Sequence, residues 1–115
     1  MKRDWEIVRK ILVELENLGD SRSLLLPGNV VAFDEQNVNY HIQILSEAGL
    51  IEAERHGGEI WVGRRLTWQG HDLLDHMRDQ GTWNKVRAVI REKGLEVSVD
   101  AVKLAASMLV YRAFR

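Results

Sequence analysis

Apolar residues recur every three or four positions in two stretches of the N-terminal half, and this spacing predicts two amphipathic helices. The first is expected over 4–18, where Asp4 can cap the start. The second is expected to begin at Asp34 and to end at about Ala48, with Gly49 as a left-handed C-cap. The predicted apolar faces consist of Ile7, Val8, Ile11, Leu12 and Leu15 in the first helix and of Val38, Ile42 and Leu45 in the second.

Extended segments are predicted on both sides of the second helix. Residues 51–55 and 59–64 alternate in part between apolar and polar positions, and they flank His56-Gly57-Gly58. Two glycines suit the tight turn of a β-hairpin, because glycine accepts the left-handed backbone that such turns need. Earlier in the chain, Ser23–Leu26 is predicted as a short strand that ends at Pro27-Gly28.

Three further helices are predicted after the hairpin. Thr67 is a suitable N-cap for a helix over 67–78, which Gly81 is expected to break. Thr82 is expected to cap the next helix, which ends at Gly94. The last predicted helix is Ser98–Phe114, with an apolar face of Val102, Ala105, Ala106, Leu109, Val110 and Ala113.

The order helix, short strand, helix, hairpin, helix is that of a winged helix. We therefore predict an α+β, mainly helical fold, with residues 1–80 as a winged-helix core. Residues 81–115 are expected to form a C-terminal extension of two extra helices, packed on the same single domain. Because residues 19–33 contain Pro27-Gly28 and a predicted strand, they leave no room for the helix that precedes a recognition helix. The predicted helix-turn-helix is degenerate for that reason.

Two motifs add a resemblance to this pattern. Residues 45–51 read Leu-Ser-Glu-Ala-Gly-Leu-Ile, and Leu66-Thr67 with Gly70 opens the following segment. Both motifs resemble those of winged-helix regulators. Together with the start of the chain and Gly81–Lys85, they make the sequence similar to the small YjcQ-like family, which is associated with phages and mobile elements. The resemblance covers most of 1–94 and implies the fold rather than an activity.

Composition limits the classes of function. The 115 residues fit one domain, and the absence of cysteine excludes a disulfide scaffold, a thiol nucleophile and an iron–sulfur cluster. The longest apolar runs, such as Leu24-Leu25-Leu26, are too short to span a membrane. The first six residues lack the apolar stretch of a signal peptide, so we expect a cytoplasmic protein with no membrane partner.

The polar face of the second helix suggests double-stranded DNA as a partner. Asn and Gln side chains can pair with adenine edges in the major groove, and cations on a wing can hold phosphates. On this hypothesis the protein is a DNA-binding transcription regulator. The candidate DNA-binding residues are Gln36, Asn39, Tyr40 and Gln43 on the helix, with Arg55, Arg64 and Arg65 on the hairpin.

The distribution of charge favours a second hypothesis, in which the partner is a protein instead of DNA. The net charge of −1 conceals a division, because residues 1–60 carry 6 Lys and Arg against 11 Asp and Glu, whereas residues 61–115 carry 10 against 6. The segment 34–48 contains no Lys or Arg, although affinity for DNA comes largely from cations. The alternative is a protein-interaction adaptor or inhibitor with an acidic winged-helix surface. Its candidate residues are Glu52, Glu54 and Trp61, the tryptophan that we most expect to be partly exposed.

No catalytic or metal-binding motif is present in the sequence. Asp72 and His76 can share a helical face, but two ligands are too few for zinc. His41 lies beside an apolar face, where a partly buried and hydrogen-bonded histidine is expected. We predict a protein that is not an enzyme and needs no cofactor, with Ser98–Phe114 as a possible homodimer interface.

Overall fold

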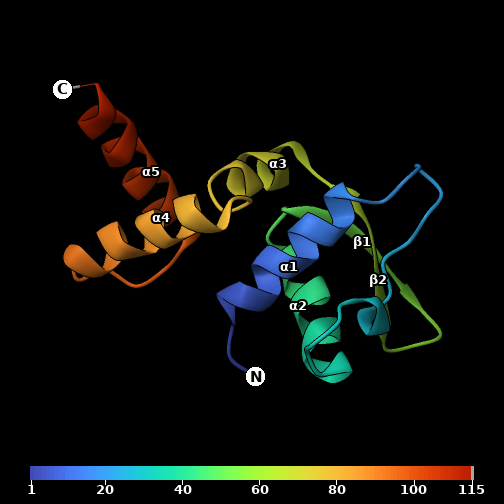
Figure 1. Cartoon of the computed structure of the whole chain (residues 1–115). Helices are drawn as coiled ribbons and strands as arrows, with labels where there is room; N and C mark the ends of the chain where they lie inside the picture. The colour runs from blue at the N-terminus through green and yellow to red at the C-terminus, as the bar shows by residue number, and fades with distance from the viewer. Residues whose placement is uncertain (115) are drawn as a thin grey trace. The chain divides into compact units, whose positions relative to one another are not determined.

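A computed structural model describes residues 1–114 and has an α+β, mainly helical architecture (Figure 1). Within that range lie five α-helices, one short 3-10 helix and one antiparallel sheet of two strands. The predicted fold class is confirmed at this level. The elements are α1 (Trp5–Glu16), η1 (Pro27–Asn29), α2 (Glu35–Glu47), β1 (Ile51–His56), β2 (Ile60–Leu66), α3 (Trp68–Asp75), α4 (Gln80–Glu92) and α5 (Val99–Ala113).

The chain divides into two compact units. The first is Met1–His71 and the second begins at Asp72, so the division falls inside α3. The sequence placed the division after residue 80, and the packing of 81–115 on a single domain stays a prediction. None of the helices in the described part of the chain is both long enough and apolar enough to cross a membrane.

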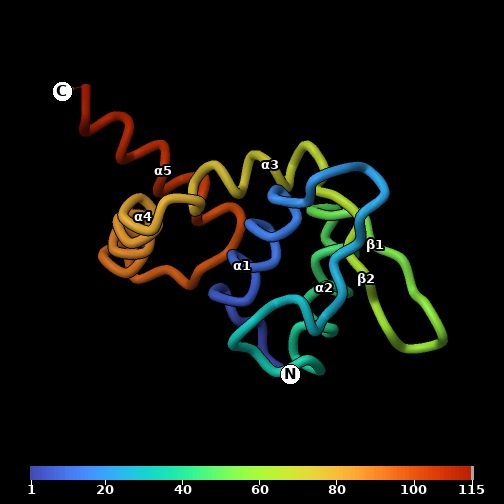
Figure 2. Tube along the Cα trace, turned by 45° about the vertical axis from the view of Figure 1, so that its right-hand side comes forward, coloured from blue at the N-terminus to red at the C-terminus, as the bar shows by residue number. Residues whose placement is uncertain are grey.

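The two predicted N-terminal helices are confirmed as α1 and α2, which lie side by side (Figures 1 and 2). The carboxylate of Asp4 accepts a hydrogen bond from the Glu6 amide at 2.9 Å, and that of Asp34 accepts one from the Asn37 amide at 3.1 Å. Gly49 has a φ of 75°, as its predicted role of left-handed C-cap requires. The buried core of α1 and α2 consists of Ile7, Val8, Ile11, Leu12, Leu15, Val38, His41, Ile42 and Leu45.

The predicted hairpin is confirmed as β1 and β2, which are joined by a turn of Gly57, Gly58 and Glu59. Both glycines have positive φ, 57° and 94°, so the tight turn depends on them. The register pairs Glu52 with Arg65 and Ala53 with Gly63, which leaves Arg64 as an extra residue on β2. This β-bulge brings the side chains of two consecutive residues to the same face of the sheet.

The predicted strand Ser23–Leu26 is wrong in extent, since only Leu25 pairs with the sheet. Its amide and carbonyl exchange two hydrogen bonds of 2.8 Å with Gly63. Before this bridge, the Asp20 carboxylate accepts hydrogen bonds from the Arg22 and Ser23 amides, and these bonds hold the Asp20 pKa below its usual value. After the bridge, η1 begins at once. The polar turn and the 3-10 helix leave a single residue to extend along β2.

The start of α3 is tied to the end of α2 through Thr67. Its hydroxyl donates to the Gly49 carbonyl at 2.7 Å and accepts from the Gly70 amide at 3.1 Å, which confirms the predicted cap. The Thr67 amide also donates to the Leu50 carbonyl at 3.1 Å. The helix itself ends at Asp75, earlier than the predicted 78.

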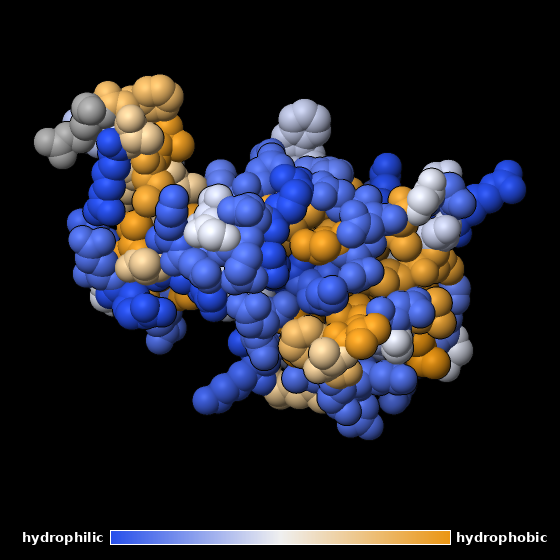
Figure 3. All heavy atoms as spheres, in the orientation of Figure 1, coloured by the Kyte–Doolittle hydropathy of each residue, from blue (hydrophilic) through white to orange (hydrophobic). Residues whose placement is uncertain are grey.

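The second unit contains α4 and α5, which pack against each other. The prediction that Gly81 breaks a helix and that Thr82 caps the next one is wrong. Asp79 is the cap, because its carboxylate accepts from the Thr82 amide at 2.8 Å and from the Thr82 hydroxyl at 3.1 Å. Gly81 therefore lies in the first turn of α4. The predicted start of α5 is confirmed, with Ser98 as its N-cap, and apolar residues gather along this helix (Figure 3).

Candidate binding site on helix α2 and the hairpin

The four residues predicted on α2 line one surface hollow of about 790 Å³. The hairpin contributes Glu59 and Ile60 to the same hollow, and the segment that contains η1 forms another wall. The prediction that Gln36, Asn39, Tyr40 and Gln43 share one face of the helix is therefore confirmed. The remaining lining residues are Met1, Leu26, Pro27, Gly28, Asn29 and Glu35.

The Asn39 side chain has a structural task that the sequence did not indicate. Its amide nitrogen donates to the Glu59 carbonyl at 3.0 Å, and its amide oxygen accepts from the Trp61 amide at 2.7 Å. Backbone groups of Glu59, Trp61 and Gly63 face the same edge of β2, because alternate residues of a strand point the same way. The Asn39 side chain therefore makes the hydrogen bonds to Glu59 and Trp61 that a neighbouring strand would make, beyond the point where Leu25 pairs with Gly63. Its amide holds the hairpin against α2 and is not available to read a base.

The other predicted α2 residues differ in their surroundings. Gln36 is exposed and Tyr40 is half-buried, and neither side chain has a hydrogen-bond partner within the described residues. Gln43 donates its amide to the Glu47 carboxylate at 3.2 Å. Gln36 and Tyr40 are thus the residues of this face that remain open to a ligand.

Two of the three predicted phosphate-binding arginines are already paired with glutamates. Arg65 forms a bidentate ion pair with Glu52, through hydrogen bonds of 2.6 and 2.8 Å, and Arg64 donates a hydrogen bond of 2.6 Å to the Glu54 carboxylate. The bulge at Arg64 explains why both arginines reach the face that Glu52 and Glu54 share. Glu52, Arg64 and Arg65 line a separate hollow of about 420 Å³, together with Leu15, Leu18, Asp20 and Ser21.

Arg55 also has an internal partner, since its Nε donates to the Gly58 carbonyl at 2.7 Å. Its guanidinium lies 6.0 Å from the centre of the Trp61 ring. The side chains of the protein-binding alternative lie beside different partners, since Glu52 and Glu54 pair with Arg65 and Arg64 whereas the Trp61 ring lies beside Arg55. Trp61 is half-buried, and the most exposed tryptophan is Trp68, with 79% of its surface accessible.

These ion pairs make a testable prediction about acid stability. The hydrogen bonds from Arg65 and from Arg64 hold the pKa of Glu52 and of Glu54 below the usual value of 4.5, and Glu52 raises the pKa of Arg65. A carboxyl group whose pKa is lower in the folded state stabilises the fold above its unfolded pKa. We expect this stabilisation to be lost as the pH falls below 4.5 through the folded values.

Urea denaturation at a series of pH values measures this loss. The double variant Glu52→Gln, Glu54→Gln should show a smaller decrease in the free energy of unfolding between neutral and acid pH than the unchanged chain. A matched variant with Glu35→Gln and Glu59→Gln, two exposed glutamates outside these ion pairs, should keep the original decrease. Equal pH dependence in the unchanged chain and the Glu52, Glu54 variant would contradict the prediction.

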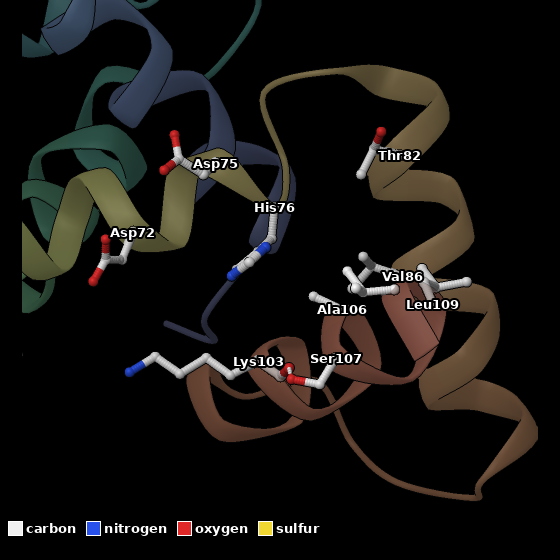
Figure 4. A pocket seen from close by; sticks show the side chains of 10 residues that line it. Asp72, Asp75, His76, Thr82, Val86, Lys103, Ala106, Ser107 and Leu109 are labelled. Carbon is white, nitrogen blue, oxygen red and sulfur yellow. Dashed lines mark hydrogen bonds between the residues drawn. The ribbon is translucent and has the colours of Figure 1, made fainter. Parts of the chain in front are cut away.

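The second unit has a hollow of its own, of about 650 Å³, which is lined by residues of α3, α4 and α5 (Figure 4). Val86, Ala106 and Leu109 form its apolar part, and Figure 4 shows the His76 ring directed into the space between α3 and α5. Asp75 is paired with Arg78 at 3.0 Å. No group of three His, Asp or Glu side chains suitable for a metal ion occurs among residues 1–114.

Fold and site together define a small α+β protein whose prominent surface feature is a hollow of mixed polar and apolar character beside a hairpin. The family model described as "Hypothetical protein (DUF2513)" matches residues 2–96, and the chain belongs to this family. An "Uncharacterized protein" of Haemophilus influenzae (strain Rd) is 41% identical over 113 residues, which is 96% of each chain. No solved structure matches the chain. The winged-helix assignment and the similarity to YjcQ-like proteins stay predictions.

Proposed function

We propose that this protein is a non-catalytic winged-helix module that binds a basic segment of a partner protein in the hollow between α2 and the hairpin. In this proposal α2 has the place of the recognition helix and the hairpin that of the wing. The element order supports the assignment, since α2 leads through Gly49 directly into β1. A module of this kind acts as an adaptor or an inhibitor rather than as an enzyme.

The chemistry of the hollow is the observation that carries this proposal. None of the twelve described residues that line it is a lysine or an arginine, and two of them are the glutamates Glu35 and Glu59. Leu26 and Ile60 at the hollow are about half exposed, with 49% and 51% of their surface accessible. Carboxylates beside exposed apolar side chains suit a peptide that carries both cations and apolar residues.

The same chemistry argues against a DNA backbone as the ligand. Phosphates bind mainly where lysine and arginine replace their counterions. Arg64 and Arg65 are already paired with Glu54 and Glu52, and these two carboxylates beside them would repel the phosphates. The four side chains contribute no net charge to the hairpin in their paired state.

DNA binding remains the second candidate, as a regulator that reads bases with α2. The observation that favours it is the exposed amide of Gln36 beside Tyr40 on the outward face of α2. Arg55 and His56 are exposed at the turn of the hairpin, where their side chains can reach a phosphate. This reading needs Arg55 to give up its bond to Gly58.

Fluorescence anisotropy distinguishes the two functions with three labelled probes: a short peptide of alternating lysine and leucine, its aspartate–leucine counterpart, and duplex DNA. We expect the lysine–leucine peptide to bind and the other two not to bind at moderate salt. The double variant Glu35→Gln, Glu59→Gln should weaken peptide binding by about threefold to tenfold, since two exposed ion pairs are lost. Added salt should weaken the binding further.

The double variant Asp72→Asn, Glu96→Gln is the matched control, because it removes the same number of negative charges from exposed positions that do not line the hollow. Peptide affinity that falls equally in this variant would show nonspecific attraction and would count against the site. Tight binding of the duplex would replace the proposal with the DNA function. In that case the double variant Arg64→Ala, Arg65→Ala should bind DNA more weakly and with a salt dependence smaller by up to about two units.

A further inference from the structure

Helix α5 has two apolar faces, and the fold buries only one of them. The buried face consists of Ala101, Val102, Ala105 and Ala106. On the opposite side, residues 104, 107, 111 and 114 follow each other at spacings of three and four, which is the repeat of a coiled-coil contact. Figure 3 shows apolar residues along this helix. We call the second face the α5 seam; it consists of Leu104, Ser107, Tyr111 and Phe114, flanked by Met108 and Val110.

The α5 seam is more exposed than apolar residues usually are. The accessible fraction is 53% for Leu104, 69% for Tyr111 and 87% for Phe114. Val110 is 58% accessible, so the exposed residues form a continuous stripe and not isolated positions. A contiguous apolar stripe on a protein surface marks an interaction site.

We propose that the α5 seam binds the α5 seam of a second copy of this chain, with the two helices antiparallel. In this arrangement Leu104 lies opposite Phe114 of the second copy and Ser107 lies opposite Tyr111. Each contact layer then joins a smaller residue to a larger one, as close packing requires. A parallel pair would place Ser107 on Ser107 and Phe114 on Phe114, which leaves a void in one layer and crowds another.

Charge and area favour a second copy over a lipid surface. Helices that lie on membranes have several cations beside their apolar face. Among residues 99–113 the cations are Lys103 and Arg112, and Arg112 lies 3.6 Å from the Glu92 carboxylate. Two seams would bury on the order of 1,000 Å² of apolar surface, since one aromatic side chain buries about 150–250 Å². This area is near the lower limit of specific interfaces, so the dimer should dissociate on dilution.

Sedimentation velocity of the full chain over a range of concentrations tests the proposal. We expect a monomer–dimer equilibrium, and we expect Leu104→Glu to raise its dissociation constant at least about tenfold. Leu95→Glu is the matched control, because Leu95 has a similar exposure of 48% but lies outside α5, and it should leave the equilibrium unchanged. Tyr111→Ser is a second variant on the seam, and circular dichroism verifies that each variant is folded.

Charge exchange tests the antiparallel direction. Leu104→Lys and Phe114→Glu should each weaken the dimer, whereas the chain with both changes should dimerise again, because each lysine then meets a glutamate of the other copy. In a parallel pair, like charges would meet and the double variant would stay monomeric. The proposal is overturned if the unchanged chain is monomeric at every concentration or binds phosphatidylcholine–phosphatidylglycerol vesicles instead. It is also overturned if Leu104→Glu and Tyr111→Ser leave the dimer intact. The proposal does not depend on the ligand of the α2 hollow.

Discussion

Replacing Gly70 with alanine is expected to destabilise the fold by about 3 kcal/mol or more. A Cβ atom at this position would overlap the backbone carbonyl oxygen of Leu50, and it would also touch the Leu66 side chain at 3.5 Å. The Leu50 carbonyl cannot retreat easily, because it accepts the Thr67 amide at the corner between α2 and α3. Alanine favours a helix by about 1 kcal/mol over glycine, so helix propensity alone predicts the opposite sign.

Urea denaturation of Gly70→Ala measures this effect, with Gly19→Ala as the matched control. A Cβ at Gly19 meets nothing within 4 Å, so the same substitution there should change the free energy of unfolding by less than about 0.5 kcal/mol. A stabilised Gly70→Ala chain would mean that helix propensity outweighs the steric overlap, and that the close contact of α3 with Leu50 is not required.

The second large effect is expected at His41, whose side chain is completely buried. Its Nε2 accepts a hydrogen bond from the Asp4 amide at 2.8 Å, which fixes the proton on Nδ1 so that Nδ1 donates to the Asn37 carbonyl at 2.8 Å. The bond to Asp4 joins the N-cap of α1 to α2. His41→Leu removes both hydrogen bonds and leaves the Asp4 amide without its acceptor, so we expect a loss of about 2–4 kcal/mol.

His56→Leu provides the control, because the same substitution there affects a side chain that is 49% accessible and bonds Glu54 at 3.3 Å. It should change the free energy of unfolding by less than about 1 kcal/mol. Amide hydrogen exchange gives a second measurement, since the Asp4 amide should lose protection in His41→Leu and keep it in His56→Leu. An unchanged exchange rate at Asp4 in His41→Leu would contradict the assigned hydrogen bond.

Sequence patterns correctly predicted those elements whose limits are set by neighbouring residues in the chain. The limits of α2 follow from the Asp34 cap and the left-handed Gly49, and the hairpin follows from Gly57 and Gly58. Competition between neighbouring caps was harder to resolve. Asp79 and Thr82 are both good N-caps, and the carboxylate of Asp79 captures the Thr82 amide and hydroxyl before Thr82 can act as one.

The face of α2 that lines the hollow could be predicted from the sequence, but the hydrogen bonds of its residues could not. Helical spacing correctly placed Gln36, Tyr40 and Gln43 on one face of α2. The role of Asn39 depends on partners 20 and 22 residues away, and no pattern within one helix reports them. The pairing of Arg64 with Glu54 depends on a bulge, which shifts the face of one strand residue and breaks the simple alternation on which sequence reasoning relies.

The amide of Asn39 also has a consequence for solubility. An open strand edge offers unpaired backbone groups to other chains, and such edges promote aggregation. Along the edge of β2 that faces α2, Leu25 forms hydrogen bonds with the backbone of Gly63, and the Asn39 side chain forms them with the backbones of Glu59 and Trp61. One residue and one side chain therefore provide the hydrogen bonds that a neighbouring strand would otherwise make. Chains that lose this amide would expose the backbone groups of Glu59 and Trp61 at this edge. The exposed edge would then offer its unpaired backbone groups to strands of other chains.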